Sequence, residues 1–571
     1  MVERPAFVAR EHELAWLEHR LDAALAGQGG VVFVTGGPGR GKTALLDVFA
    51  RQAMDKHDEL LVASGNCNAY SGVGDPYLPF REVLDMLSGD VEAPWASGAI
   101  SRDHALRLWG ALPLAVQALL DHGPHVVPGL LPGPALLSRA KAVAPPGAPW
   151  LQRLTERVER QAAHSDGLEQ SHLFQQVTNL LRTLAEAHPL LLILDDLQWI
   201  DTTSAGLLFH LGRRLEGSRI LVAGAYRPEE ISLGREGERH PLEAVLAEFK
   251  RDLGDVWVDL AEVQEREGRR FVDAFLDMEP NSLGEGFRGA LFAHTAGHPL
   301  FTVELLRTMQ ERGDLVQDDS GCWVEGPALD WETLPARVEG VIEARIGRLE
   351  PELREILSVA SVEGEEFTAQ VVARVQGLGE RQALRRLSRE LEARHRLVLE
   401  QAALRLGRQR LSRYRFAHAL FQQYLYNHLG EGERVLLHGE VAGALEALYE
   451  GHPDGVAAIA PQLARHFTEA GDERHALKYL LLAGDGALAA YANGEAEEYY
   501  HRALALGPGE SARAHLLSRL GEALFRQSRF REAIQTWGEG IERYKALEDS
   551  DGLARLYARS SRAADLANDP A

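Results

Sequence analysis

Short apolar runs and amphipathic helical stretches alternate over the first half of the chain. Each run is rich in branched apolar residues and has the length of a strand, and the stretches between the runs repeat apolar residues at helical spacing. The runs span residues 30–35, 60–64, 190–195, 220–226 and 256–260. Buried strands that alternate with helices are typical of a doubly wound parallel sheet. The pattern predicts a parallel α/β sheet domain over about residues 1–260. A helical insertion is expected at about 91–165, where Pro, Gly and Leu are frequent.

The second half of the chain is predicted to be mainly helical. Residues 261–333 indicate a small helical lid domain with an irregular stretch around 313–330. Residues 334–449 combine helices with two short strand-like runs, 397–401 and 413–418, which is the pattern of a winged-helix domain. A chain of 571 residues is long enough for several domains, since one domain usually holds roughly 100–200 residues. We therefore expect a multidomain α/β plus α protein.

Residues 450–571 contain comparable helical units, which predict the start of an α-helical tetratricopeptide-like solenoid. Each unit sets an alanine shortly before an aromatic residue, as tetratricopeptide helix pairs do. The pairs are Ala476 with Tyr479, Ala496 with Tyr500, and Ala533 with Trp537. Such arrays need a capping helix, and none is obvious before residue 571, which would fit a truncated form of a longer protein. The nearby His466 and His501 are expected to be surface residues.

A glycine-rich segment between the first predicted strand and the next helix fits the motif G-x-x-x-x-G-K-[ST]. Its residues are Gly36, Gly37, Pro38, Gly39, Arg40, Gly41, Lys42 and Thr43. The backbone N–H groups of such a P-loop, together with the positive end of the helix that follows, surround the phosphates of a nucleotide. The lysine of this motif contacts the β- and γ-phosphates, and the hydroxyl ligates magnesium. The segment predicts binding of ATP or ADP with Mg²⁺, with Thr43 as a metal ligand.

Charged residues follow two other predicted strands. Asp195 and Asp196 end the apolar run at 190–195, where a P-loop fold places its second acidic motif. We expect Asp195 in the magnesium shell and Asp196 to orient or deprotonate the attacking water. Arg227 follows the run at 220–226, at the sheet edge where α/β proteins bind ligands, and could read the γ-phosphate. The alternatives are an exposed acidic turn and an arginine paired at the surface.

Charge and cysteine content narrow the class of protein. The formal net charge of −23 disfavours nucleic acid as the default partner, because non-specific binding rests on clustered Lys and Arg. Cys67 and Cys322 are far apart and outside any C-x-x-C pattern, so a disulfide framework or a zinc site is not indicated. The N-terminal residues lack the pattern of a signal peptide, and no apolar run approaches the 18 residues expected of a membrane helix. A cytoplasmic location without membrane anchoring is expected.

The spacing of the P-loop, the segment LLILDDLQWID and the segment GAYR resembles the STAND family, signal-transduction ATPases related to AAA proteins. The likeness covers most of residues 1–449. It is closest to the subgroup of bacterial maltose-regulon activators and ATPase modules attached to some adenylyl cyclases. Residues 7–11, FVARE, resemble the F-V-G-R-E segment that lies near the adenine in that family. The resemblance makes Arg10 a nucleotide-binding candidate, although Ala9 stands where the family usually has glycine.

Two further segments resemble STAND motifs. Gly297-His298-Pro299 resembles the G-x-P motif that closes the helical lid over the nucleotide, so Gly297 and Pro299 become binding candidates. A common Gly-x-Pro turn is the alternative. Residues 416–418, FAH, resemble the winged-helix position where relatives place a histidine against the β-phosphate of ADP. His418 is therefore a candidate ligand of the nucleotide, and a structural histidine is the alternative.

The resemblance implies an ATP-dependent switch for signalling or defence. In such proteins ADP holds the nucleotide domain, lid and winged helix closed. A protein or small-molecule trigger sensed by the C-terminal repeats opens them, ATP replaces ADP, and the protomers self-associate. Slow hydrolysis of ATP then resets the switch. The trigger acts only through its different affinity for the two forms.

Two other functions remain open. Seven arginines lie close together in the predicted wing, with only Glu400 opposing them, and a basic wing can grip DNA phosphates. They are Arg394, Arg396, Arg405, Arg408, Arg410, Arg413 and Arg415. The first rival is therefore a DNA-acting ATPase or transcription regulator, although the same arginines could equally pair with acidic surface nearby or with another protomer. The second rival is a scaffold that binds ATP with negligible turnover.

Overall fold

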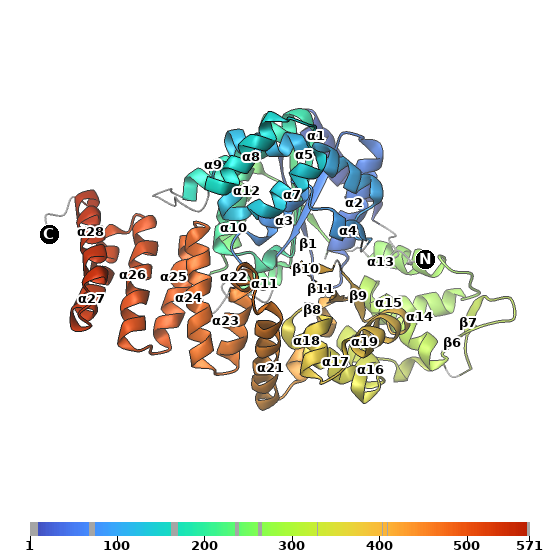
Figure 1. Ribbon diagram of the computed structural model, residues 1–571. Helices are drawn as coiled ribbons and strands as arrows, with labels where there is room; N and C mark the ends of the chain where they lie inside the picture. The colour runs from blue at the N-terminus through green and yellow to red at the C-terminus, as the bar shows by residue number, and fades with distance from the viewer. Residues whose placement is uncertain are drawn as a thin grey trace.

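The computed structural model describes residues 10–67, 75–96, 98–160, 170–234, 239–260, 265–327, 329–401, 403–407 and 409–567. An α/β sheet domain comes first and is followed by a helical lid, a winged-helix domain and an array of helical repeats. Figure 1 shows the sheet domain above the winged-helix domain and the repeats extending to one side. The predicted fold class is confirmed.

The sheet domain is built on five parallel strands. In order across the sheet they are β2 (Leu61–Asn66), β3 (Leu190–Asp195), β4 (Ile220–Tyr226), β1 (Gly30–Thr35) and β5 (Trp257–Asp259). Val31 pairs with Val222 of β4, and Leu61 pairs with Leu190 of β3. Parallel strands place their carboxyl ends at one edge, where α/β sheets bind ligands. The segments that follow β1, β3 and β4 therefore meet at this edge.

Helices cover both faces of the sheet. Val32 and Val34 of β1 join one apolar core with α1 (Glu11–Leu25) and α2 (Lys42–Lys56), whereas Val31 and Phe33 join the core on the opposite face. This alternation follows from the two-residue period of a strand. The helices and one 3₁₀ turn on the second side are α3 (Leu78–Leu87), α9 (Gln170–Ala187), η1 (Leu197–Trp199), α10 (Thr202–Gly212), α11 (Pro228–Leu233) and α12 (Pro241–Leu253). Residues 92–160 add α4 (Glu92–Ala96), α5 (Arg102–His122), α6 (Val126–Leu130), α7 (Gly133–Val143) and α8 (Pro149–Arg160).

The lid has an apolar core of its own. Its elements are α13 (Glu265–Leu276), α14 (Glu285–Thr295), α15 (Pro299–Arg312), β6 (Leu315–Gln317), β7 (Trp323–Glu325) and η2 (Trp331–Thr333). Phe287, Leu291, Leu305 and Met309 are buried in this core. The stretch expected to be irregular contains a small antiparallel hairpin, β6–β7. Each of its strands has three residues, which is too short for a periodic signal in the sequence.

The winged-helix domain contains more strands than the sequence predicts. Its elements are α16 (Val338–Gly347), α17 (Pro351–Glu363), β8 (Glu366–Thr368), α18 (Ala369–Val375), α19 (Glu380–Arg385), a π-helical continuation (Arg386–Arg394), β9 (Val398–Glu400), β10 (Leu404–Leu406), β11 (Gln409–Leu411), β12 (Arg413–Phe416), α20 (Ala419–His428) and α21 (Glu431–Tyr449). Strands β8, β12 and β9 form an antiparallel sheet, and β10 and β11 form a separate hairpin. The short β8 was not predicted, because three residues show no alternation.

The repeats form a row of neighbouring helices, drawn from orange to red in Figure 1. They are α22 (Pro453–Ala458), α23 (Ala460–Glu469), α24 (Glu473–Ala489), α25 (Asn493–Ala505), α26 (Glu510–Arg526), α27 (Phe530–Ala546) and α28 (Ser550–Ala567). A Cβ at Gly484 would lie 2.5 Å from the Tyr500 ring, and one at Gly521 would lie 2.3 Å from the Trp537 ring. An aromatic residue of α25 or α27 therefore packs against a glycine of the preceding helix. The predicted units treated Tyr479, Tyr500 and Trp537 as equivalent positions. Tyr479 lies in α24, the first helix of a pair, whereas the other two lie in second helices, so the predicted alignment of its unit was wrong.

The repeat array contacts the sheet domain through a buried carboxylate. Glu495, in the first turn of α25, accepts a hydrogen bond of 2.8 Å from the Thr203 backbone N–H and another from the Thr203 hydroxyl. Thr203 lies in the first turn of α10, which Asp201 caps. Glu495 and Thr203 are each 3% exposed. A carboxylate of one domain thus satisfies a backbone N–H in the first turn of a helix of another.

Docking of the repeats is expected to weaken as pH rises. Burial, with the Asp201 carboxylate, raises the pKa of Glu495 from 4.5 to about 7, and Asp75, Tyr77 and Tyr499 also face this cluster. The docked form therefore binds protons more tightly than the released form, so docking is strongest below pH 4.5 and is lost progressively as pH rises to 7. Limited proteolysis between α25 and α26 at pH 5.5 and pH 8 measures the release. A Glu495→Gln variant with the same pH dependence as the wild type would contradict this assignment.

Candidate functional site

The P-loop joins β1 to α2 at the carboxyl edge of the sheet. Gly39 and Gly41 have φ angles of 72° and 87°, in the left-handed region that favours glycine. The Lys42 Nζ donates hydrogen bonds to the Gly36 carbonyl (2.8 Å) and the Gly37 carbonyl (3.1 Å). The ammonium group therefore lies inside the loop, at the positive end of α2.

Oxygen atoms suited to a magnesium ion converge beside the loop. The Thr43 hydroxyl donates a hydrogen bond of 2.6 Å to Asp195, which also accepts the Asp196 N–H at 2.8 Å. Burial, with the charge of Asp196, raises the pKa of Asp195. Burial, with the charge of Arg227, lowers the pKa of Lys42 to about 8. A hydroxyl and a carboxylate oxygen are ligands that Mg²⁺ accepts, so the residues present fit this ion.

Asp196 and Arg227 are connected through Gln198, a residue that no sequence motif marks. The Gln198 amide donates to Asp196 (2.6 Å), and its carbonyl accepts the Arg227 backbone N–H (3.1 Å). Arg227 Nη2 lies 3.7 Å from Asp196, and Nη1 donates to Glu230 (2.7 Å). Burial lowers the pKa of Arg227, but the carboxylates of Glu230 and Asp196 outweigh this effect, so its pKa is raised. The only sequence signal for Gln198 is an amide placed two residues after the strand-terminal acids.

The lid reaches the P-loop through the first turn of α15. His298 Nε2 lies 3.1 Å from the Pro38 carbonyl oxygen, and the Leu300 N–H donates to the Gly39 carbonyl at 3.3 Å. A Cβ at Gly39 would lie 2.7 Å from the Leu300 Cβ, so glycine permits this close approach. Burial, with the charge of Arg40, lowers the pKa of His298 to about 4. His298 is therefore uncharged at neutral pH.

Gly297 and Pro299 shape the turn on both sides of His298. Gly297 has a φ of 68°, and a Cβ there would lie 2.4 Å from the Gly268 Cα of α13. Pro299 is the first residue of α15, where its missing N–H costs no hydrogen bond. Gly297 and Pro299 are the two predicted binding candidates of this turn. In the structure, His298 between them makes the contact with the loop.

Arg10 lies near the P-loop. It precedes α1 and forms an ion pair of 2.6 Å with Glu13. Burial, with the nearby charge of Arg10, lowers the pKa of Arg40, and Asp259 opposes this change. The two arginines therefore face each other closely enough to interact. The rest of the FVARE segment before Arg10, residues 7–9, lies outside the described residues.

The winged-helix domain brings His418 to the same site. The ring caps α20, where Nδ1 accepts the Leu420 N–H at 3.2 Å. Burial, with the charges of Arg227 and Lys42, lowers the pKa of His418 to about 3, and His298 also lies near the ring. The ring is therefore neutral at physiological pH, and residues from the sheet domain, lid and winged-helix domain surround one position.

Two arginines of the predicted basic wing lie near acidic side chains of the protein. Arg413 forms an ion pair with Glu366 of β8. Arg415 faces Asp47 of α2, where burial raises the pKa of Asp47 and Arg415 opposes the increase. The Arg413 ion pair matches the alternative in which the wing arginines pair with acidic surface nearby.

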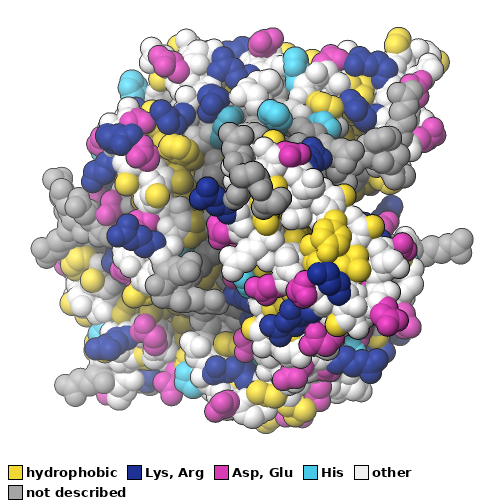
Figure 2. All heavy atoms as spheres, turned by 90° about the vertical axis from the view of Figure 1, so that its left-hand side faces the viewer, with side chains coloured by type: hydrophobic (Ala, Val, Ile, Leu, Met, Phe, Trp, Pro, Cys, Tyr) yellow, Lys and Arg dark blue, Asp and Glu magenta, His cyan; other side chains and the backbone are white. Residues whose placement is uncertain are grey.

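The hairpin β10–β11 holds the exposed part of the wing. Arg405 and Arg410 are paired across this hairpin and are exposed, and Arg408 lies outside the described residues. A Cβ at Gly407 would lie 2.6 Å from the His452 ring, so the hairpin packs against the segment that enters the repeats. Figure 2 shows side chains of both charges interspersed over the face at the repeat end.

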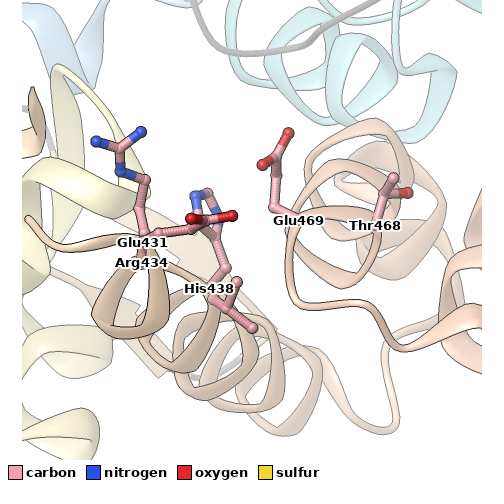
Figure 3. A pocket seen from close by; sticks show the side chains of 6 residues that line it. Glu431, Arg434, His438, Thr468 and Glu469 are labelled. Carbon is pink, nitrogen blue, oxygen red and sulfur yellow. The ribbon is translucent and has the colours of Figure 1, made fainter.

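A separate polar hollow lies between α21 and α23, shown in Figure 3. Its volume is about 560 Å³, and it is lined by Glu431, Arg434, Val435, His438, Thr468 and Glu469. His438 Nδ1 lies 2.8 Å from the Nδ1 of His466, which is fully buried. His466 is therefore a core residue and not the surface residue that was predicted, because α23 turns it toward α21. Its sequence neighbours gave no sign of this packing.

Residues 6–223 match the family model described as "AAA ATPase domain". The chain carries an AAA ATPase domain. The match spans the P-loop, Asp195 and Asp196 and ends within β4, so the expected relationship to AAA proteins is confirmed for this domain. An uncharacterized protein of Rhizobium meliloti (strain 1021) is 24% identical over 506 residues, which cover 87% of this chain. The chain spans 42% of the length of that curated relative.

Solved structures resemble the chain at low identity. A STAND protein with a tetratricopeptide repeat sensor from Pyrococcus horikoshii is 12% identical, with 99% of this chain and 75% of that chain covered and a TM-score of 0.40. The ORC1 protein of Aeropyrum pernix in complex with DNA is 14% identical, with 74% and 94% covered and a TM-score of 0.27. Likenesses this distant carry no argument about function. Among the described residues, no helix is long and apolar enough to cross a membrane.

Proposed function

We propose that this chain is a STAND-type switch that binds ATP or ADP with Mg²⁺, hydrolyses ATP slowly and couples the nucleotide to self-association. The observation that carries the proposal is the convergence of three domains on one site. Lys42 and Asp195 come from the AAA ATPase domain, His298 comes from the lid, and His418 comes from the winged-helix domain. A nucleotide held there can bias the relative position of all three.

The P-loop residues support binding of the phosphates. Lys42 is held by two loop carbonyls and can exchange them for oxygens of the β- and γ-phosphates. Thr43 and Asp195 would hold the magnesium ion, which supplies positive charge at the phosphate oxygens when it is bound. Arg10 and Arg40 lie near each other and place further positive charge beside the loop.

Asp196 and Arg227 support hydrolysis. Asp196 is held by the Gln198 amide and can orient a water molecule and accept its proton as the water attacks the γ-phosphate. Arg227, 3.7 Å from Asp196, can stabilise the charge that develops on the transferred group. Because both acids are present, we favour the switch over a scaffold with negligible turnover.

The winged-helix domain and the repeats support a closed form. Since the Nδ1 of His418 accepts a backbone N–H, the proton of the neutral ring lies on Nε2, which can donate to the β-phosphate. Glu495 holds the repeats on α10, the helix that follows the Asp195 strand. A protein or small-molecule trigger that binds the repeats better when they are released would open the molecule. The hollow between α21 and α23 is a surface that such a trigger could bind.

The wing contacts favour the switch over a DNA-acting ATPase. Arg413 is paired with Glu366, and Arg415 lies near the Asp47 carboxylate, so less positive charge is free to neutralise phosphates. Stimulation of hydrolysis by duplex DNA would reverse this preference.

We expect nucleotide-dependent assembly once the repeats are released. A Glu495→Lys variant places a cation at the positive end of α10 and should release the repeats without a trigger. Size-exclusion chromatography with light scattering should show a monomer with ADP and a larger species with a slowly hydrolysed ATP analogue. The matched control is Glu498→Lys, an exposed residue of the same helix that pairs with Arg502.

The result that counts against the switch is a monomer with ADP, ATP and the analogue for both the wild type and Glu495→Lys. If the larger species forms equally with ADP, assembly does not depend on which nucleotide is bound, which also contradicts the switch. Assembly of Glu498→Lys to the same extent as Glu495→Lys would assign the effect to added charge and not to release of the repeats.

A further inference from the structure

The 3₁₀ turn η1, which follows the two strand-terminal acids, packs against the neighbouring strand β4. Asp196 leaves β3 with a φ of 52° and a ψ of 41°, so the backbone turns sharply into the left-handed region. The Trp199 N–H donates to the Asp196 carbonyl at 2.9 Å and closes the turn. Leu197 is fully buried, and a Cβ at Gly224 of β4 would lie 2.6 Å from the Leu197 Cδ1. A glycine in β4 therefore allows η1 to approach this strand closely.

The same turn directs the Gln198 side chain between the ends of β3 and β4. The residue is 1% exposed. Its Nε2 donates to the Asp196 Oδ1 at 2.6 Å, and its Oε1 accepts the Arg227 N–H at 3.1 Å. An amide satisfies both contacts in only one of its two orientations, because the donor must face the carboxylate and the acceptor must face the N–H. The amide therefore cannot be flipped without loss of both hydrogen bonds.

The backbone of Gln198 is held by a third segment. His240 precedes α12 as its N-cap and is 2% exposed. Its Nδ1 accepts the Leu242 N–H at 3.1 Å, so the ring proton lies on Nε2. That Nε2 lies 2.9 Å from the Gln198 carbonyl oxygen, to which it donates. Gln198 is thus anchored to the ends of β3 and β4 and to the start of α12.

These contacts leave the Asp196 carboxylate oriented and still accessible. Its Oδ1 accepts the Gln198 amide and lies 3.7 Å from the Arg227 Nη2. The Asp196 side chain is 18% exposed, so water can reach it. Both contacts involve Oδ1, and the other carboxylate oxygen can take a proton from that water.

We propose that Gln198 is a positioning residue for ATP hydrolysis, because its amide holds the Asp196 carboxylate at a fixed place relative to Arg227. The inference rests on the proposed function, in which Asp196 accepts the proton of the attacking water and Arg227 stabilises the transferred group. Gln198 acts on the reaction only through these two residues. A misplacement of about 1 Å in a reacting group can lower a rate about 100-fold.

The effect is expected on the chemical step and not on nucleotide binding. Lys42 and Thr43, which are proposed to hold the phosphates and the magnesium ion, make their hydrogen bonds to the P-loop and to Asp195. Gln198 takes part in none of these contacts. Loss of its amide should therefore lower kcat and leave ATP affinity nearly unchanged.

The test measures ATP turnover by single-turnover phosphate release and ATP affinity by calorimetry, both on the full chain. Gln198→Glu has the same size and keeps an oxygen for the Arg227 N–H, but it has no N–H for Asp196. We expect turnover to fall by about 30- to 100-fold, as for a misplaced reacting group. ATP affinity should change by less than about threefold on the same protein. Gln198→Leu removes both contacts and should lower turnover at least as much, should the glutamate variant fail to fold.

The matched control is Gln176→Leu in the same domain. The Gln176 carbonyl oxygen accepts the His125 N–H at 2.9 Å and joins α9 to the helical insertion. Its replacement removes the same kind of hydrogen bond, from a glutamine side chain to a distant backbone N–H, without touching the two acids or the P-loop. Turnover of this variant should equal that of the wild type.

A double variant separates positioning from a general loss of structure. If Gln198 acts through Asp196, then Gln198→Leu in an Asp196→Asn background should lower turnover by less than about threefold further, because residues that act on one step are not additive. A merely structural role would give the full loss again, and that result would overturn the inference.

Wild-type turnover in both Gln198 variants would also overturn it, as would an equal loss in Gln176→Leu. A fall in ATP affinity that accounts for the whole change in kcat/KM would assign Gln198 to binding and contradict positioning. Failure of the proposed function looks different, because the wild type itself would then show no ATP turnover.

Discussion

Replacing Lys42 by alanine is expected to abolish detectable ATP binding. The side chain lies inside the P-loop with hydrogen bonds to two of its carbonyls, and these are the positions from which it can contact phosphate oxygens. A charged hydrogen bond contributes roughly 1.5–3 kcal/mol, and loss of contacts to two phosphates should lower affinity by about 100-fold or more. Isothermal titration calorimetry with ATP and Mg²⁺ measures the change directly.

Lys56→Ala is the matched control for this experiment. Lys56 ends the same helix, α2, and forms an exposed ion pair with Glu18, far from the loop. Its replacement should leave ATP affinity unchanged, because exposed pairs contribute little. If Lys42→Ala retains wild-type affinity, the P-loop does not bind ATP, and the proposed switch is wrong.

Replacing Asp196 by asparagine should lower ATP turnover by about 100- to 1,000-fold while ATP still binds, because loss of a general base costs about this much. Asparagine keeps the oxygen that accepts the Gln198 amide, so the local geometry is retained. It cannot take the proton of the attacking water. Single-turnover phosphate release measures the chemical step, and calorimetry on the same variant measures binding.

Asp58→Asn provides a comparison that changes the same charge at a distance, since the Asp58 side chain is 99% exposed. Its turnover should equal that of the wild type. If Asp196→Asn hydrolyses ATP at the wild-type rate, another group activates the water. Loss of ATP binding in Asp196→Asn would instead assign this residue to binding.

The parts of the fold with strong local signals were predictable from the sequence. The predicted strands 30–35, 190–195 and 220–226 coincide with β1, β3 and β4, because long apolar runs are buried on both sides of a parallel sheet. The glycine spacing of the P-loop is itself a requirement of its geometry, as the left-handed Gly39 and Gly41 show. These features depend on residues that are close together in the sequence.

Features that depend on tertiary contacts were not predictable in the same way. His298 meets Pro38 across 260 residues, and neither residue carries a local sign of the other. Gln198 has no periodic or motif signal that marks it as the connection between Asp196 and Arg227. The predicted alignment of the repeat units was wrong for a related reason. An alanine before an aromatic residue occurs in both helices of a pair, and only the glycine that receives the ring distinguishes them.

The contact between Glu495 and Thr203 has a consequence for newly made chains. The two residues are 292 positions apart. At a synthesis rate of about 5–20 residues per second, the AAA ATPase domain waits about 15–60 s on the ribosome before Glu495 exists. During that interval α10 has no carboxylate from the repeats on its first turn. Every molecule therefore begins with its AAA ATPase domain undocked, and it meets the nucleotides of the cell before the repeats can hold it.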